Sequence, residues 1–394
     1  MPDHKQSILG VLAWYMAVGV LVFASILPAR ASHVLLISVD GLRADVVTPE
    51  LMPTLSSLRE KGASTLEAES LWPTFTIPNH VSLCTGLTPE THEANFLASP
   101  GNDFVLPHDT IFELAHNAGR TTGIYLSKTK LGILAKPGTY DHLFVNNKRD
   151  SIETVSRFLE DVSAKKSRPE LTLLHIIEPD AVGHSRGWMS DEYLESVTAS
   201  DRYLADIVRT LEDVGAMDDT LIIVTADHGG IGFNHGERVP EVIRIPWIAF
   251  GAGVPRGLTI TRRIGSHDAA PTVLKALGLS VPKVMEGTAV EEVFSDPRVL
   301  FLRGDCDGDG KVGGTTSEAI FLLRFAFLSG DTPPCLTACD ATANGAIGVA
   351  DAVRILRYSF LGGEPLEPPF PDCSLSSLPS DVALGCKSSP DGCE

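Results

Sequence analysis

The sequence has few basic residues and, over most of its length, few cysteines. Lysine and arginine number 32 against 50 aspartate and glutamate residues, which gives a formal net charge of −18. This balance excludes a nucleic-acid backbone as a general partner and favours a chain that can hold cations. Of the seven cysteines, only Cys84 lies outside the last quarter of the chain. Cysteine content therefore separates a long first region from a cysteine-rich tail.

Hydrophobic residues, in contrast, are plentiful. They make up 43% of the 394 residues, which is enough for a substantial core and excludes a wholly disordered chain. A chain of this length accommodates one large domain together with a smaller one.

The first 31 residues have the pattern of a signal peptide. Lys5 precedes an apolar stretch over residues 8–27, and Ala29 and Ala31 follow it in the spacing of a cleavage site. The apolar stretch is also long enough for an uncleaved membrane anchor. Both alternatives predict that the remainder of the chain is exported, to the periplasm, the cell surface or the medium.

The crowding of cysteines in the tail predicts disulfide bonds. In an exported chain such cysteines pair, although their connectivity does not follow from the sequence. A zinc site at Cys335-x3-Cys339 is a weaker alternative because no second matching pair follows. Cys84 is expected to be a buried small side chain. The tail cysteines are Cys306, Cys335, Cys339, Cys373, Cys386 and Cys393.

Between His33 and about Ser295, apolar β-branched runs alternate with helical segments. Residues 51–62 and 191–215 have helical spacing, and the second is a long amphipathic helix. This alternation predicts an α/β fold with a largely parallel central sheet and helices on both faces. The expected buried strands are residues 34–39, 122–126, 171–177, 221–226 and 245–250.

Acidic and imidazole side chains follow three of these expected strands. Because the carboxyl ends of parallel strands meet at one edge of a sheet, we expect these side chains to lie together. Carboxylates combined with imidazoles favour zinc or a similar divalent ion over calcium or magnesium. The residues are Asp40 after the first strand, Asp180 and His184 after the third, and Asp227 and His228 after the fourth, with His235 a few positions later.

The stretch LWPTFTIPNHVS, residues 71–82, indicates a loop that turns into the N-terminus of a helix. Such an end presents unpaired backbone N–H groups and suits a phosphate-like anion. Thr76 in this stretch is either a helix cap, which is the commoner role of such a residue, or a nucleophile.

Five motifs in this region occur in the order found in the nucleotide pyrophosphatase/phosphodiesterase family of the alkaline phosphatase superfamily. The chain resembles that family over roughly residues 34–280, including the ending DAAPTVLKALGL. The resemblance implies an alkaline phosphatase-like fold. The five motifs are SVDGLRAD, TFTIPNHVSLCTGLTPETH, EPDAVGH, TADHGG and NHGE.

The resemblance also implies two zinc ions, or similar divalent ions. Thr76 would be the nucleophile and would form a phospho-threonine intermediate, and Asn79 would donate its amide N–H to a phosphoryl oxygen. A threonine hydroxyl needs a divalent ion to lower its pKa for such an attack near neutral pH. Thr74 has no such role in the pattern and is expected to be structural. One ion would be held by Asp180, His184 and His235, and the other by Asp40, Asp227, His228 and Thr76.

The implied activity is hydrolysis of a small phosphate-ester substrate, of the phosphodiesterase or nucleotide pyrophosphatase type. The residues Thr76 to His80 differ from the Cys/Ser-x-Pro-x-Arg of sulfatases, and the long insertions of the animal family members are absent. Phosphonate and phosphomonoester hydrolases of the same superfamily stay open, as does a surface-attachment protein with an idle hydrolase domain. Lys128 and Lys130 either touch an anionic substrate or, more commonly for such residues, belong to a solvated loop.

From Arg303 onward an internal repeat resembles the paired calcium loops of dockerin-type modules. Each copy opens with spaced Asp or Asn residues before Gly and continues into an apolar helix, which implies a small, α-helical, EF-hand-like module that binds Ca²⁺. The resemblance also implies that this module binds a cohesin-like or cell-surface partner. The first loop carries two extra residues before Ser317-Glu318, so its last ligand is not fixed by spacing. The expected calcium ligands are Asp305, Asp307 and Asp309 in the first loop, and Asp340, Thr342, Asn344 and Asp351 in the second.

The expected organisation therefore has three parts. They are a signal peptide over residues 1–31, an alkaline phosphatase-like phosphodiesterase domain over residues 32–298, and a dockerin-like repeat pair with a disulfide-rich tail over residues 303–394. A degenerate helix pair held by disulfides is the alternative for the last part.

Overall fold

The computed structural model describes residues 31–101, 104–148, 150–164, 168–294, 300–375, 381, 384–386 and 393. All of the predicted signal peptide except Ala31 lies outside the described residues. We call residues 31–294 the sheet domain and the described residues from 300 onward the C-terminal module. Among the described residues, no helix combines the length and the apolar character needed to cross a membrane.

The sheet domain is built on one eight-stranded sheet, in the order β4-β3-β5-β1-β6-β7-β2-β8. The central strands are continuous apolar runs that are buried on both faces, as expected for a sheet covered by helices. The strands are β1 (His33–Val39), β2 (Ala63–Glu69), β3 (Thr122–Leu126), β4 (His142–Val145), β5 (Leu171–Ile176), β6 (Thr220–Thr225), β7 (Arg244–Gly251) and β8 (Leu258–Thr259).

Strands β4, β3, β5, β1 and β6 are parallel to one another, which confirms the largely parallel sheet. Strand β7, in contrast, is antiparallel to both β6 and β2. The connection from β6 to β7, residues 226–243, contains only the short helix α9 (Pro240–Ile243). It remains at the carboxyl edge of the sheet, so β7 begins at that edge and runs back. All five expected strands are present, and β2, β4 and β8 are additional.

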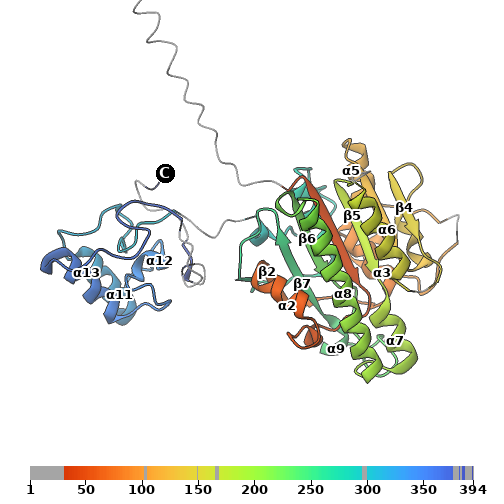
Figure 1. The fold of residues 1–394 in the computed structure, drawn as a ribbon, viewed down its shortest axis with the longest axis horizontal. Helices are drawn as coiled ribbons and strands as arrows, with labels where there is room; N and C mark the ends of the chain where they lie inside the picture. Colours follow the sequence, from red (N-terminus) through yellow and green to blue (C-terminus); the bar gives the residue numbers. More distant parts are fainter. Residues whose placement is uncertain are drawn as a thin grey trace, which may run out of the picture.

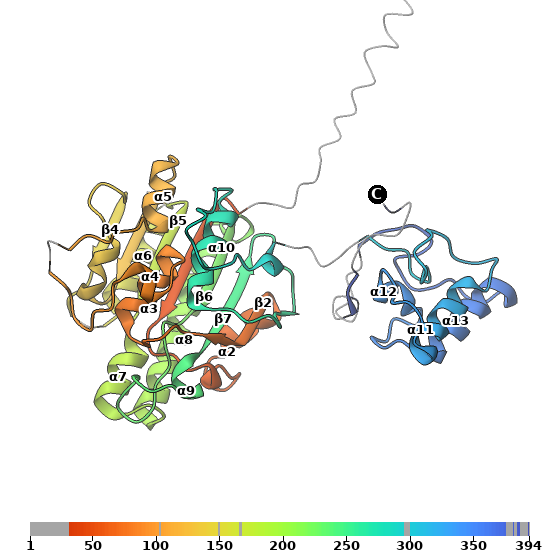
Figure 2. The ribbon, with the colours of Figure 1, turned by 180° about the vertical axis from the view of Figure 1, so that it is seen from behind.

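Helices cover both faces of this sheet. Helices α2, α6 and α8 lie over one face, and α3, α4, α5 and α10 lie over the other (Figures 1 and 2). The two expected helices correspond to α2 and to the 23-residue α8, whose first turn is capped by the Ser190 side chain. The helices of this domain are α2 (Pro53–Glu60), α3 (Thr76–Thr85), α4 (Pro89–His92), α5 (Ile111–Asn117), α6 (Ile152–Ser163), α7 (Glu178–Arg186), α8 (Asp191–Asp213), α9 (Pro240–Ile243) and α10 (Ala269–Ala276).

The described part of the C-terminal module is built around two long helices that pack against each other, each preceded by a loop that begins with an aspartate. Its small core includes Leu322 and Ile355, one from each long helix. The helices are α11 (Ser317–Leu328), the short α12 (Leu336–Cys339) and α13 (Val349–Leu361). This arrangement agrees with the internal repeat seen in the sequence.

The predicted disulfides are present. They join Cys306 to Cys339, Cys335 to Cys386 and Cys373 to Cys393, and Cys84 is a free, buried cysteine. Cys335 and Cys339 belong to two different disulfides, so the alternative of a zinc site at this pair is wrong.

A buried arginine also holds the segment after α13 to the rest of this module. Arg303 is fully buried and forms an ion pair with Asp381 at 2.6 Å. Its guanidinium also donates to the carbonyl oxygens of Asp340 and Pro368. Because a buried guanidinium needs such partners, this residue fixes the segment around Pro368 against the helices.

Candidate metal centre

The candidate site lies at the carboxyl edge of the parallel strands. Asp40 directly follows β1, Asp180 lies in the first turn of α7 after β5, and Asp227 is two residues beyond β6. Gly41 lets these segments approach, because it has φ +73° and a Cβ there would lie 2.8 Å from the Cα of Asp180. The backbone N–H of Asp180 donates to the carbonyl of Asp40 at 3.0 Å. The expected clustering of the strand ends is therefore present.

One group of ligand atoms comprises Asp180, His184 and His235. The Nε2 atoms of His184 and His235 are 3.1 Å apart, and they lie 3.4 Å and 3.9 Å from Oδ1 of Asp180. In a tetrahedral zinc site with bonds of about 2.0–2.1 Å, ligand atoms are about 3.3–3.4 Å apart. The three atoms thus have the spacing of ligands around one cation.

A second group comprises Asp40, Asp227 and His228. Nε2 of His228 lies 3.2 Å from Oδ2 of Asp227 and 3.7 Å from Oδ1 of Asp40. The same atom is 4.0 Å from Oδ1 of Asp180, and the imidazole stacks on His235 with ring centroids 3.8 Å apart. His228 therefore lies between the two groups, and its shorter distances place it with Asp40 and Asp227. We call these six residues the metal centre.

All three imidazoles are held in the same way. Nδ1 of His184 contacts the carbonyl of Phe233 at 3.1 Å, Nδ1 of His228 that of Gly229 at 2.8 Å, and Nδ1 of His235 that of Thr74 at 2.7 Å. A carbonyl oxygen only accepts, so each Nδ1 carries the proton and each Nε2 presents a lone pair. Histidines that bind metals characteristically donate their second nitrogen to such a partner.

Polar atoms without hydrogen-bond partners provide a further test of the fit to a cation. Among the described residues, buried Oδ1 of Asp40, Oδ1 of Asp180, Oδ2 of Asp227 and Nε2 of His228 have none. All four atoms are among those whose mutual distances define the two groups. Such acceptors, together with facing lone pairs on His184 and His235, are costly to bury unless a cation satisfies them. The donor set fits two divalent ions.

The carboxyl groups of the centre differ in pKa. Burial raises the pKa of Asp40, but the ammonium of Lys128 and the hydrogen bond from His175 more than offset this and hold it well below its ordinary value. Burial and the charge of Asp40 raise the pKa of Asp180. The effects of Lys128 and His184 are opposite and together larger, so the net shift of this pKa is downward. Burial and the neighbouring charge of Asp40 raise the pKa of Asp227 to about 7.

Two of the imidazoles are kept neutral. Burial, and then the repulsion that two adjacent protonated rings of His228 and His235 would have, lowers the pKa of His235 to about 3, and burial lowers the pKa of His228. The nearby carboxylate of Asp180 raises the pKa of the more exposed His184. Neutral imidazoles and ionised carboxylates are the forms that bind metals, so most of this site is prepared for a cation at neutral pH.

Thr76 lies at the first position of α3 and is buried. Its Oγ1 is 3.4 Å from Nζ of Lys128, which in turn lies 2.7 Å from Oδ2 of Asp40 and 2.5 Å from Oδ2 of Asp180. The hydroxyl is therefore separated from a carboxylate of each group by a single ammonium. The first-turn N–H groups of α3 lie at the same end of the helix.

The expected role of Asn79 does not fit this arrangement. Its Nδ2 donates to the carbonyls of Leu71, Pro73 and Phe75 at 3.0–3.3 Å, and its Oδ1 accepts from the N–H of Leu71 and the hydroxyl of Ser266. Both amide protons are used within the protein, so none is left for a phosphoryl oxygen. Asn79 instead shapes the loop that precedes Thr76.

Thr74 has the structural role expected of it. Its carbonyl accepts from Nδ1 of His235, and its hydroxyl donates to the carbonyl of the same residue. Thr74 thereby fixes both the backbone and the ring of one ligand.

One residue of the site, His175, was not identified from the sequence, and for Lys128 a solvated loop was the commoner of the two alternatives. Lys128 is buried rather than part of a solvated loop, and His175, inside β5, donates from Nε2 to Oδ2 of Asp40 at 2.9 Å. The available signal was a histidine within an apolar strand, LTLLHI, and a lysine two residues beyond the end of β3. Both positions are at or near the edge that carries the ligands.

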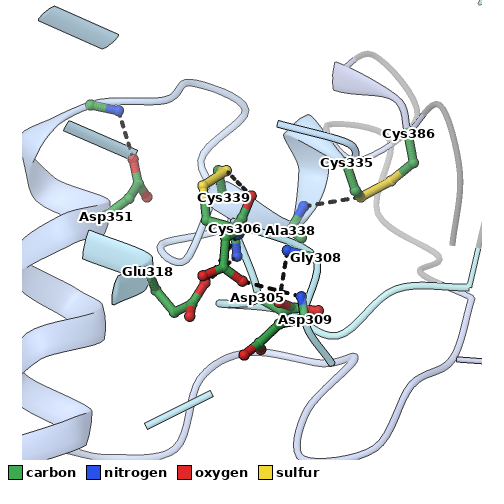
Figure 3. Close-up of a disulfide and its surroundings, with 12 residues drawn as sticks. Asp305, Cys306, Gly308, Asp309, Glu318, Cys335, Ala338, Cys339, Asp351 and Cys386 are labelled. Carbon is green, nitrogen blue, oxygen red and sulfur yellow. Dashed lines mark hydrogen bonds between the residues drawn. A yellow bond between two sulfur atoms is a disulfide. The ribbon is translucent and has the colours of Figure 1, made fainter. Parts of the chain in front are cut away.

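The C-terminal module contains a separate acidic cluster in its first loop. Carboxylate oxygens of Asp305, Asp307, Asp309 and Glu318 lie within 4.8 Å of one another, and Figure 3 shows Asp305, Asp309 and Glu318 turned toward the same space beside the Cys306–Cys339 disulfide. Glu318, after the two extra residues, therefore completes the loop. Burial raises the pKa of Asp305 to about 7 and also raises that of Glu318.

The second loop has the same backbone pattern with fewer charges. Asp340 accepts from the N–H groups of Asn344 and Gly345 at 3.1 Å and 2.7 Å. Asp351 accepts from the N–H and hydroxyl of Thr342 at 3.0 Å and 2.7 Å. The structure thus brings together all four expected residues of this loop.

Comparisons with known proteins agree with the geometry. The family model for type I phosphodiesterase / nucleotide pyrophosphatase matches residues 34–248, which is more than half of the chain. Venom phosphodiesterase 2 of Crotalus adamanteus is 27% identical over 252 residues, which are 58% of this chain and 30% of that protein. The chain therefore spans less than a third of the length of this curated relative.

Solved structures show the same fold in the sheet domain. Murine ectonucleotide pyrophosphatase/phosphodiesterase 5, in an inactive form with AMP, has a TM-score of 0.58 at 18% identity and covers 67% of this chain and 100% of its own. A phosphonate monoester hydrolase from Silicibacter pomeroyi has a TM-score of 0.54 at 17% identity and covers 66% of this chain and 76% of its own.

Proposed function

The chain belongs to the type I phosphodiesterase / nucleotide pyrophosphatase family, and we propose that it hydrolyses phosphoric diesters or pyrophosphates at the metal centre with Thr76 as the nucleophile. The observation that carries this proposal is the convergence of three anchored imidazoles with three unpartnered carboxylate oxygens. Relatives named as phosphodiesterases support the class of reaction.

The proposed cofactors are two zinc ions or similar divalent ions. Three imidazole nitrogens among the six residues of the metal centre favour zinc over magnesium or calcium, which prefer all-oxygen sites. Asp180, His184 and His235 would hold one ion, and Asp40, Asp227, His228 and the Thr76 hydroxyl the other. When bound, the ions would lower the pKa of that hydroxyl and stabilise charge on the phosphoryl and leaving oxygens.

The chain's own residues would perform the transfer in two balanced steps. Oγ1 of Thr76 forms a bond to phosphorus while the bond from phosphorus to the leaving oxygen breaks, and the hydroxyl proton passes through solvent to that oxygen, which departs as an alcohol from a diester or as a phosphate from a pyrophosphate. The oxygen of a water molecule then forms a bond to phosphorus while the bond from phosphorus to Thr76 breaks, one proton of that water returns to Thr76, and a phosphoric monoester departs. The N-terminus of α3 would favour the negative phosphoryl group throughout.

Turnover of three substrates tests the reaction class. We expect the purified protein to hydrolyse p-nitrophenyl thymidine monophosphate faster than p-nitrophenyl phosphate or phosphonoacetate. A large excess of monoester or phosphonate turnover would replace the proposed class by the phosphomonoesterase or phosphonate hydrolase alternative. No turnover of any of the three would favour the idle-hydrolase alternative.

For the C-terminal module we propose calcium binding, chiefly at the first loop. The mutual approach of four carboxylates from Asp305, Asp307, Asp309 and Glu318 supports this, and an all-oxygen donor set is the one that Ca²⁺ prefers. The second loop, with Asp340, Thr342, Asn344 and Asp351, would bind more weakly because it carries less charge. Calcium titration by calorimetry would show at least one site, and its absence after Asp305→Asn would assign it.

A dockerin-like role with a cohesin-like or cell-surface partner, and export through the N-terminal segment, complete the proposal. The three disulfides support export, because such bonds persist in oxidising compartments. Mass spectrometry of the mature protein from the culture medium or periplasm would test both export and cleavage before Ser32.

A further inference from the structure

Lys128 occupies a position that a surface lysine does not reach. It follows β3 by two residues, and only 8% of its side chain is exposed. Its Nζ lies 2.7 Å from Oδ2 of Asp40, 2.5 Å from Oδ2 of Asp180 and 3.4 Å from Oγ1 of Thr76. An ammonium has three N–H donors, and three acceptors surround this one.

The oxygens that Lys128 contacts are not the oxygens that face His184, His228 and His235. Each carboxylate gives Lys128 its Oδ2 and keeps Oδ1, which among the described residues has no hydrogen-bond partner. The contacts of Lys128 are therefore compatible with a metal ion at each group. Oδ2 of Asp40 also accepts from Nε2 of His175 at 2.9 Å, so this outer oxygen is fixed by two donors.

The two carboxylates belong to different ligand groups, and the third acceptor is the proposed nucleophile. A single side chain thus links both halves of the metal centre to the reacting oxygen. Fixing the rotamers of Asp40 and Asp180 keeps their inner oxygens directed at the ions, and a nearby N–H stabilises negative charge that develops on Oγ1 of Thr76.

We propose that Lys128 is a positioning residue of the reaction, which holds one carboxylate of each ligand group by its outer oxygen and directs its remaining N–H at the oxygen of Thr76. This inference rests on the proposed function, because it gives the lysine a role in attack by Thr76. The proposed role differs from that of an ion pair that only stabilises the folded protein, because it makes Lys128 matter more for turnover than for metal binding.

Two variants of Lys128 and one control test this role. Lys128→Met keeps the length of the side chain and removes its charge, and Lys128→Arg keeps the charge but cannot place the same three N–H groups. Lys136→Met removes a lysine that is ion-paired at the surface with Glu113 and serves as the control. Each metal-free protein is titrated with zinc chloride in a calorimeter, and the zinc-loaded proteins are assayed with p-nitrophenyl thymidine monophosphate.

We expect Lys128→Met still to bind two zinc ions per chain, with an affinity at most about tenfold weaker, because the lost positioning of the two carboxylates is offset in part by removal of a positive charge beside the ligands. Its kcat should fall by about 100-fold, the size typical for loss of one donor that acts on the reacting oxygen. KM should change by much less, Lys128→Arg should lose at least about tenfold in kcat, and Lys136→Met should match the wild type.

Wild-type kcat in Lys128→Met, or zinc affinity that falls in parallel with kcat, would overturn the inference. If Lys128→Met does not fold, Lys128→Arg decides: two bound zinc ions with reduced kcat support the role, and unchanged kcat contradicts it. Failure of the proposed function looks different, since the zinc-loaded wild type itself would then turn over no phosphate ester.

Discussion

The sheet domain and the C-terminal module both gather carboxylates, but they satisfy them in opposite ways. In the metal centre, one oxygen each of Asp40, Asp180 and Asp227 has no hydrogen-bond partner among the described residues. In the first loop of the module, Asp305 accepts from the N–H groups of Gly308 and Gly310, and Glu318 accepts from that of Cys306. Cations would therefore supply the missing partners of the first site, whereas in the second site backbone N–H groups already hold the carboxylates in place for a Ca²⁺ ion.

The difference follows from the scaffold of each site. Parallel strands hold the ligands of the metal centre in fixed directions, so unsatisfied atoms cannot turn away to find other partners. The module has a small core, and its loops lie beside disulfides that maintain the chain path. We therefore expect chemistry to depend on the sheet domain and metal-linked stability to be the main function of the acidic loops.

The largest contrast should come from Thr76. We expect Thr76→Ala to lower kcat for the diester by at least about 10³-fold, because no other hydroxyl takes the place of the nucleophile. Thr76→Ser, which keeps the hydroxyl, should retain measurable turnover. Steady-state kinetics of the two variants provide the measurement, and equal rates for Thr76→Ala and the wild type would remove the nucleophile from the account.

Loss of one imidazole should weaken zinc binding at one ligand group and leave the other group unchanged. We expect His184→Ala to weaken one of two zinc equivalents by at least about 100-fold, since a direct ligand matters at least as much as its outer partners. The exposed His116 of α5 provides the control, and His116→Ala should bind both ions normally. Calorimetric zinc titration distinguishes the cases, and two unchanged sites in His184→Ala would contradict the assignment.

Removal of a disulfide should affect only the module. For the 33-residue separation between Cys306 and Cys339, the double variant Cys306→Ser/Cys339→Ser should lose about 3–4 kcal/mol of module stability. Faster amide hydrogen exchange in α11 and α13 would report this loss. Diester turnover should remain at the wild-type value, and a parallel loss of turnover would show that the two regions depend on each other.

The smallest effect should be a pH dependence of the calcium-free module. The pKa of Asp305 in the folded chain is raised from 3.8 to about 7, so folding favours the protonated carboxyl. The stabilisation is complete below the ordinary pKa and is lost as the pH rises through about 7. Protection factors of α11 and α13 should therefore be lower at about pH 8 than at about pH 5, and calcium should restore them. Equal protection factors at the two pH values without calcium would contradict the burial of these acidic groups.

The fold and the clustering of the candidate ligands at the strand ends followed from the sequence because both depend on local patterns. Apolar runs gave the five main strands, and the rule that ligands gather at carboxyl ends brought Asp40, Asp180 and Asp227 to one edge. The reversal of β7 did not follow, because an apolar strand has the same pattern in either direction. The short β4 and the polar β2 were missed for lack of a continuous apolar run.

Side-chain roles within the site were less accessible to sequence reasoning. Asn79 has the right position for a phosphoryl contact, but its amide is used by carbonyls that only the folded loop brings together. Lys128 is polar and follows a strand, so its burial depended on tertiary ion pairs with Asp40 and Asp180 that no local pattern reveals. The disulfide connectivity was likewise set by the packing of the module.

Diffraction data collected at the zinc absorption edge from crystals of the zinc-loaded protein would test the central claim most directly. The account predicts two anomalous peaks, one among Asp180, His184 and His235 and the other among Asp40, Asp227 and His228, with the hydroxyl of Thr76 beside the second. A single peak, or peaks remote from these side chains, would contradict it.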